Sequence, residues 1–124
     1  MMKKLSVIAL VALCIGVFSF VQPVTAANPI PLGLLLPYTG DWAWVGAGAD
    51  PGGELAVKEI NSDKSLQPIG RPIKLYKGDT ETKSKPAIEA ARKLYDVNKV
   101  VGIVGPSSAS IRSVIPLSKE AGAV

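Results

Sequence analysis

The chain has 124 residues, with 14 basic and 10 acidic side chains, no histidine and a single cysteine. The missing histidine removes the commonest metal ligand and the commonest general base, which argues against zinc hydrolases and Ser-His-Asp catalysis. The charges are nearly balanced and the lysines are spread along the chain, so no nucleic-acid partner is indicated. We therefore expect no metal, no cofactor and no nucleic acid.

The first 26 residues have the pattern of a cleaved secretory signal. Two lysines precede an apolar run from Leu5 to Val21, and Val24-Thr25-Ala26 supplies a small-x-Ala cleavage site. A retained membrane anchor is the alternative, although the run is barely long enough to span a bilayer. Cys14 follows a large residue inside this run, so lipid attachment is not expected. We expect an exported protein whose mature part is residues 27–124, without thiols.

Short strands and helices alternate after this segment. Ile30 to Leu36 is an apolar run typical of a strand, and Asp50-Pro51 predicts the start of a helix that ends near Asn61. Pro72 to Gly78 alternates in polarity and predicts a strand near the edge of a sheet. The inner face of the first helix is expected to hold Leu55, Ala56 and Ile60.

A second helix, a third strand and a third helix follow. Pro86 opens the second helix, and Val100 to Val104 is a β-branched run typical of a buried strand. The third helix is expected from Ser110 to Gly122, with Pro116 kinking it. Ala123-Val124 resembles the start of another strand, so we expect a fragment of a longer protein. The apolar stripes of the two helices are Ala87, Ile88, Ala91, Leu94 and Tyr95, and then Ile111, Val114, Ile115 and Ser118.

This order predicts an α/β fold with a doubly wound parallel sheet. In such sheets a ligand lies beyond the carboxyl ends of the strands, typically between the first and third strands. The loops expected there are residues 37–49 and 105–110. The first is rich in glycine, but it lacks the third glycine of a dinucleotide-binding motif and has no Gly-Lys-Ser/Thr, so phosphate binding is disfavoured.

The serines after the third strand are candidate ligands for an anion. Ser107, Ser108 and Ser110 lie where the strand ends and a helix opens. The N–H groups and the positive end of the helix dipole favour a carboxylate or phosphate there, and serine hydroxyls can add hydrogen bonds. The alternative is that these serines only cap the helix.

Two tryptophans in the first loop are candidates for an apolar wall. Trp42 and Trp44 stand in a glycine-rich turn that also contains a tyrosine. Aromatic rings at the mouth of a site can stack on a ligand. The alternatives are that they pack beneath the loop or against a second domain. We expect one of the two, not both, to contact the ligand.

Several stretches together resemble type I periplasmic solute-binding proteins of ABC importers, in the branched-chain amino-acid-binding group. The matching stretches are Gly33-Leu34-Leu35-Leu36-Pro37-Tyr38-Thr39-Gly40 with Gly46, Glu54 to Asn61, Gly70 to Leu75, Asp79-Thr80, Ala91 to Leu94, and Val100 to Ser108 with the helix to Gly122. The resemblance implies a periplasmic-binding-protein-like type I fold, of which the chain is part of the N-terminal lobe, and a ligand held between two lobes.

The resemblance also assigns roles to residues. It implies that Ser108 grips the ligand carboxylate, with Ser107 and Ser110 close enough to exchange with it. The family often has an aromatic residue at the position of Val45, whereas the tryptophan here is Trp44. Asp79 matches an acidic residue that we interpret as structural.

The function implied is capture of an amino acid, branched-chain-like, or a similar small polar solute in the periplasm, and its delivery to a membrane permease without catalysis. A ligand-binding sensor domain of a receptor with the same fold is the alternative. An exported α/β enzyme would need catalytic groups outside these residues.

Overall fold

Three strands and three main helices alternate along residues 28–124, as the sequence predicts. The computed structural model describes residues 28–124, and the predicted signal, residues 1–26, lies outside the described residues. In the described part, no helix combines the length and the apolar character needed to cross a bilayer. The elements are β1 (Ile30–Leu36), α2 (Ala43–Ser62), η1 (Pro68–Gly70), β2 (Ile73–Asp79), α3 (Ser84–Arg92), η2 (Lys93–Val97), β3 (Ile103–Val104) and α4 (Ser108–Ala121).

The sheet is parallel, with the strand order β2-β1-β3. The chain therefore leaves β1 on one side to form β2 and returns on the other side to form β3, which confirms the predicted doubly wound arrangement. Strand β2 lies at an edge, also as predicted. Val124 lies alongside β3, on the side away from β1. The Ile103 N–H donates to the Val124 carbonyl at 2.9 Å, and the Val124 N–H donates to the Val101 carbonyl at 3.1 Å.

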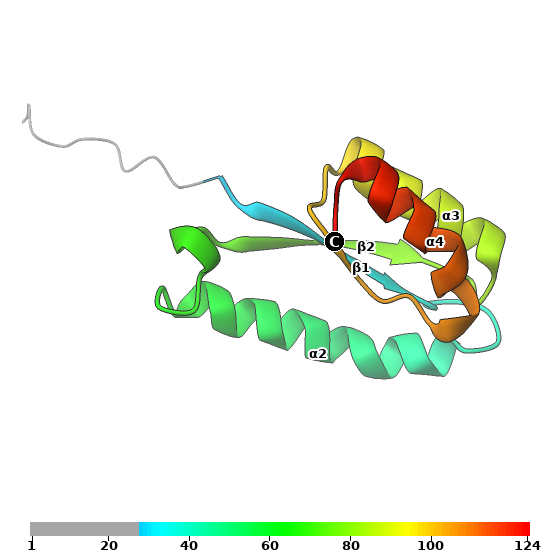
Figure 1. Cartoon of the computed structure of the whole chain (residues 1–124). Coiled ribbons are helices and arrows are strands. Elements are labelled where there is room, and N and C mark those ends of the chain that lie inside the picture. The colour runs from blue at the N-terminus through cyan, green and yellow to red at the C-terminus, as the bar shows by residue number, and fades with distance from the viewer. Residues whose placement is uncertain (1–27) are drawn as a thin grey trace, which may run out of the picture.

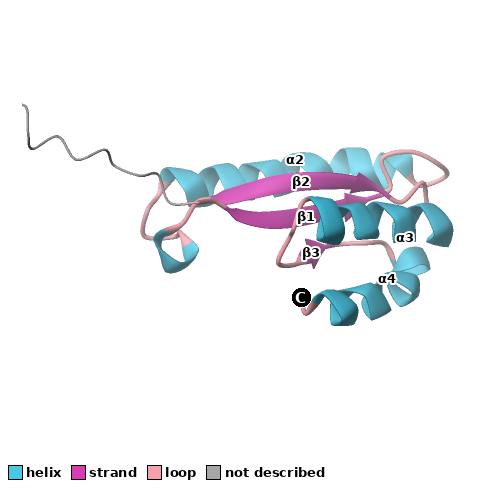
Figure 2. Cartoon of the chain, turned by 90° about the horizontal axis from the view of Figure 1, so that it is seen from above, coloured by secondary structure: helices cyan, strands magenta, loops and turns pink. Residues whose placement is uncertain are grey.

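The helices cover the sheet from two sides. Helix α2 lies on one face, and α3 and α4 lie together on the other (Figures 1 and 2). The main apolar cluster lies on the side of α3 and α4. The predicted apolar stripe of the second helix faces this cluster, and of its five residues only Ile88 is partly buried and not fully buried. The buried members of the cluster are Leu35, Ala87, Ala91, Leu94, Tyr95, Val100, Val114 and Leu117.

Helix α2 differs from its prediction at its start and on its inner face. It begins at Ala43 instead of Asp50, and Pro51 stands inside it. The Asp50 carboxylate does not cap a helix, because it binds side chains of other elements, as described below. Leu55 is 54% exposed and Ala56 is exposed, whereas Gly46 and Gly53 face the sheet, with Ile60 half-buried beside them. The helix approaches the sheet through its glycines, so the large side chain at position 55 stays outside.

Helix α4 begins at Ser108, two residues before the predicted start at Ser110, and ends at Ala121. Gly122 follows it with a left-handed backbone (φ 62°), which is the expected helix stop. Pro116 stands inside the helix and does not end it, and Val114 and Leu117 on either side of it are buried in the main cluster. The predicted stripe is wrong in two positions, since Ile111 and Ile115 are 40% and 47% exposed. Ser118 belongs to the inner side, where its Oγ lies 2.8 Å from the Tyr95 hydroxyl.

Candidate functional site

The candidate site lies at the edge of the sheet where β1 and β3 end. Two glycines bring the backbone segments together there. A Cβ atom on Gly105, which has φ 97°, would lie 2.1 Å from the Leu35 carbonyl oxygen. A Cβ atom on Gly46 would lie 2.3 Å from the Pro37 carbonyl oxygen. Because no side chain fits at either position, the turn after β3 and the first turn of α2 both lie directly against the end of β1.

The serine turn opens α4 at this edge. Ser107 has extended backbone angles (φ −61°, ψ 159°), and its carbonyl accepts the N–H groups of Ser110 and Ile111 at 2.9 and 3.1 Å. Within the described part of the chain, its hydroxyl makes no capping hydrogen bond. The capping alternative is therefore not realised at Ser107, although its backbone is that of an N-cap residue.

The three predicted serines differ in their surroundings. Ser108 is exposed at the first position of α4. The Oγ atoms of Ser107 and Ser110 are buried and have no hydrogen-bond partner among residues 28–124. Buried hydroxyls ordinarily have partners, so this part of the turn has unused hydrogen-bonding capacity beside the positive end of a helix.

Asp79 fixes the loop after β1. One carboxylate oxygen accepts the N–H groups of Tyr38, Thr39 and Glu81 at 2.9, 3.2 and 2.9 Å, and the other accepts the Thr39 hydroxyl at 2.7 Å. Partial burial by itself would raise the pKa of Asp79, but these hydrogen bonds to the charged form outweigh it and lower the pKa below 3.8. The contacts of Asp79 are those of a structural residue, as predicted.

A second polar cluster joins the same loop to α2 and β2, and the sequence analysis did not find it. The Tyr38 hydroxyl donates to Asp50 Oδ1 at 2.6 Å, and Lys77 Nζ donates to Asp50 Oδ2 at 2.7 Å and also to Glu54. Burial and the neighbouring Asp50 raise the pKa of Tyr38, whereas the hydrogen bonds from Lys77 and Tyr38 lower the pKa of Asp50. The four-residue spacing of Asp50 and Glu54 was the only available signal for this cluster.

The predicted aromatic residues take different positions. Trp42 precedes α2, is 43% exposed, and donates its backbone N–H to Thr82 Oγ1 at 3.1 Å. Trp44 is 75% exposed and lies on the outer side of α2, two residues before the sheet-facing Gly46. Val45 is half-buried. The loop after β1 is shorter than predicted, because α2 already includes Trp44 and Val45.

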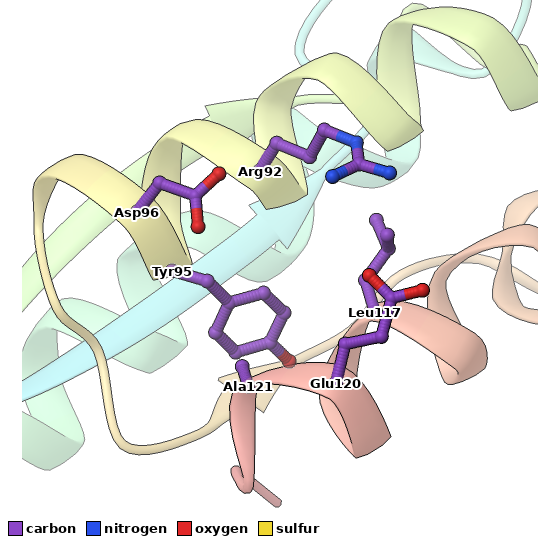
Figure 3. Close-up of a pocket in the computed structure, with 6 residues that line it drawn as sticks. All are labelled: Arg92, Tyr95, Asp96, Leu117, Glu120 and Ala121. Atoms are coloured by element: carbon purple, nitrogen blue, oxygen red, sulfur yellow. The ribbon is translucent and has the colours of Figure 1, made fainter.

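Two hollows lie away from the serine turn, near the C-terminal ends of η2 and α4. One has a volume of about 100 Å³, and Figure 3 shows it between the two helices. The second, about 370 Å³, lies beside it and is lined by Lys99, Val100, Val101 and Gly122 among others. No predicted site residue lines either hollow. The residues around the first are Arg92, Tyr95, Asp96, Leu117, Glu120 and Ala121.

In this parallel α/β domain, the start of α4 favours an anion and lies where the strand order reverses, between β1 and β3. Such a position is where domains of this architecture bind ligands. The profile of the periplasmic binding protein family matches residues 29–124, and the chain belongs to that family. A similar relative is the Leu/Ile/Val-binding protein homolog 7 of Brucella abortus, which is 39% identical over 83 residues, 67% of this chain and 20% of the relative. An amino acid binding protein of Pseudomonas aeruginosa is 32% identical over 102 residues, 80% of this chain and 26% of the relative.

Solved structures give the same result. The branched-chain amino acid transporter substrate-binding protein LivJ of Streptococcus pneumoniae, in complex with isoleucine, superposes with a TM-score of 0.71 at 26% identity, covering 77% of this chain and 27% of that protein. An ABC transporter solute-binding protein of R. palustris, in complex with benzoate, has a TM-score of 0.64 at 29% identity, covering 77% and 26%. This chain therefore spans about a quarter of these relatives. Both of these solved structures are substrate- or solute-binding proteins of transporters.

Proposed function

We propose that the chain is the N-terminal part of the first lobe of a periplasmic solute-binding protein, which captures a branched-chain-like amino acid and delivers it to an ABC permease without catalysing a reaction. The observation that carries this proposal is the serine turn at the start of α4. It combines a helix start with an exposed Ser108 and two buried hydroxyls that have no partner among residues 28–124, at the edge where β1 and β3 end. The family and the transport relatives described above support the same class of function.

The turn suits a carboxylate for three physical reasons. The first N–H groups of a helix have no acceptor within the helix, and the dipole favours negative charge at that end. A hydroxyl at the first helical position can donate to the same anion. Ser108 is therefore assigned the direct contact, and Ser107 and Ser110 line the turn behind it. A hydrogen bond to a charged group contributes about 1.5 to 3 kcal/mol.

The loop after β1 forms the neighbouring wall in this proposal. Trp42 is the tryptophan assigned to the ligand, together with Val45, because Trp44 lies on the outer side of α2. The hydrogen bonds from Tyr38 and Thr39 to Asp79 hold the loop in place before a ligand arrives. A wall that is already ordered lowers the entropic cost of binding.

Titration of the full-length protein tests the carboxylate assignment. L-leucine and L-isoleucine are compared with 3-methylbutylamine, the amine that L-leucine leaves on decarboxylation, by calorimetry and tryptophan fluorescence. We expect binding of the amino acids and at least a tenfold loss for the amine. Equal affinity for leucine and its amine would contradict a carboxylate site.

A pair of serine variants locates the contact. Ser108→Ala should weaken binding of the amino acid about 5- to 150-fold, which corresponds to about 1 to 3 kcal/mol. Ser113→Ala is the matched control, because Ser113 lies on the same helix and its hydroxyl is already bonded to the Ser110 carbonyl at 2.7 Å. Unchanged affinity in Ser108→Ala would transfer the assignment to Ser107 or to the backbone alone.

A further inference from the structure

The turn between β2 and α3 holds the loop after β1 through one hydroxyl. Thr82 Oγ1 accepts the backbone N–H of Trp42 at 3.1 Å and donates to the Thr39 carbonyl at 3.4 Å. A threonine hydroxyl can do both at once, because it has one donor and two acceptor lone pairs. Thr39 and Trp42 stand on the two sides of the bend at residues 40–41, so one side chain from a separate turn closes this bend.

A glycine lets the turn and the loop touch. Gly40 has a left-handed backbone (φ 84°), and a Cβ atom there would lie 2.5 Å from the Glu81 carbonyl oxygen and 3.0 Å from Thr82 Oγ1. Because a side chain at position 40 would displace the turn, this contact requires glycine there. The hydrogen bonds of Thr82 therefore belong to a close contact between two backbone segments.

Residues 81 and 82 adopt a backbone conformation that their side chains disfavour. Glu81 and Thr82 have positive φ angles of 46° and 58°. Such angles are uncommon outside glycine, asparagine and aspartate, and they are outliers for a β-branched residue such as threonine. A strained conformation persists only where its surroundings fix it. Here the Glu81 N–H donates to Asp79 at 2.9 Å and the Thr82 N–H donates to Thr80 Oγ1 at 3.3 Å, so the turn presents the Thr82 hydroxyl in a fixed place.

We propose that Thr82 is a positioning residue for the ligand, because its hydroxyl holds Trp42 in place at the wall of the candidate site. This role rests on the proposed function, in which Trp42 is the tryptophan assigned to the ligand. Trp42 is 43% exposed, so packing restrains it only in part. Its carbonyl accepts the Val45 N–H at 2.9 Å, so the contact with Thr82 also places Val45, the other residue of the wall. Without the Thr82 hydroxyl the loop must be ordered when the ligand binds, and this cost lowers the affinity.

Fluorine NMR of the full-length protein, labelled with 5-fluorotryptophan, reports on Trp42 without any ligand. The signal that disappears in Trp42→Phe is that of Trp42. Thr82→Val removes the hydroxyl and keeps the branched shape, and it should shift and narrow this signal because the ring becomes more mobile. Thr82→Ser keeps the hydroxyl and should leave the signal nearly unchanged. An unchanged Trp42 signal in Thr82→Val would overturn the proposal.

Titration with L-leucine measures the consequence for binding. We expect Thr82→Val to weaken binding about threefold to tenfold, and Thr82→Ser by no more than about twofold. A shifted Trp42 signal with unchanged affinity would overturn the role in ligand positioning. An unmodified protein that binds no amino acid, with a Trp42 signal that still moves in Thr82→Val, would overturn the proposed function and leave Thr82 as the residue that fixes the loop.

Thr82→Gly separates the hydroxyl from the strained backbone. Glycine adopts left-handed angles freely, so the stability in urea should be retained or increase, while the affinity for L-leucine falls as in Thr82→Val. A threonine with a purely structural role would give the opposite pattern, with lower stability and unchanged affinity. That pattern would overturn the proposal.

Discussion

The two faces of the sheet are held by different chemistry. On the face covered by α3 and α4, Leu35 and Leu94 belong to one continuous buried cluster of apolar side chains. On the face covered by α2, Leu34 is the buried aliphatic residue outside that cluster, and it lies against Gly53. Charged side chains join α2 to the sheet through the Tyr38–Asp50–Lys77 hydrogen bonds, whereas the side-chain hydrogen bond at the main cluster joins two uncharged hydroxyls, those of Tyr95 and Ser118.

The two faces therefore have different roles: one supplies most of the stability of the domain, and the other sets the position of the loop after β1. Burial of apolar area is the larger source of folding free energy, so the face of α3 and α4 holds the domain together. Hydrogen bonds and glycine contacts contribute less but depend on direction, and they set where the loop after β1 lies relative to the candidate site. Substitutions on the two faces should therefore differ in size and kind.

The largest expected effect is in the main cluster. Leu94→Ala should lower the free energy of unfolding by about 2 to 5 kcal/mol, because it leaves a cavity where the side chain is 1% exposed. Leu55→Ala, at 54% exposure on α2, should change it by less than about 0.5 kcal/mol. Urea denaturation followed by circular dichroism measures both. Equal losses would show that the two faces contribute alike.

Glycine contacts should be next in size. Gly46→Ala should cost about 1 to 3 kcal/mol, because its Cβ atom would meet the Pro37 carbonyl and the backbone must shift. Gly48→Ala, with open space around it, should instead stabilise α2 by about 0.5 to 1 kcal/mol through its better helix propensity. The same denaturation experiment, at low protein concentration, distinguishes them. Loss of stability in both variants would contradict the close approach at Gly46.

Asp79 should make stability depend on pH. Its folded pKa is lowered, so its contribution is complete above 3.8, the ordinary value, and is lost as the pH falls through the folded pKa. At neutral pH, Asp79→Asn should cost about 1 to 2 kcal/mol, a value reduced for solvent screening. Denaturation at a series of pH values should show this difference shrinking in acid. A difference that does not vary with pH would mean that the charge of Asp79 is unimportant.

The smallest effect is expected at the tyrosine hydroxyl. Tyr38→Phe should cost about 0.5 to 1.5 kcal/mol, because it removes the hydrogen bond to Asp50 and leaves that carboxylate with Lys77 alone. Tyr76→Phe is the control, since no side-chain hydrogen bond joins the Tyr76 hydroxyl to another described residue, and it should be nearly neutral. Equal effects in the two variants would indicate that the Tyr38 hydroxyl does not tie the loop to α2.

Local sequence determined the order of the elements and some of their bounds, although β3 forms only at Ile103–Val104 of the strand predicted over residues 100–104. The apolar run Ile30–Leu36 forms β1 as predicted, and Gly122 ends α4, because strand formation and helix stops depend on neighbouring residues. The serine turn was placed correctly at the end of β3 for the same reason. The resemblance to the family followed from these local stretches in their order and spacing.

Only the tertiary structure decided how α2 lies and what fixes the loop beside the candidate site. The helix starts seven residues before its predicted N-cap, and Leu55 stays outside, because Gly46 and Gly53 meet β1 instead. The loop is held by Asp79, 41 positions from Tyr38, and by Asp50, 12 positions from it. Helical periodicity and capping rules describe neighbours along the chain. They cannot indicate that a carboxylate which resembles a helix cap will bind a tyrosine from another element.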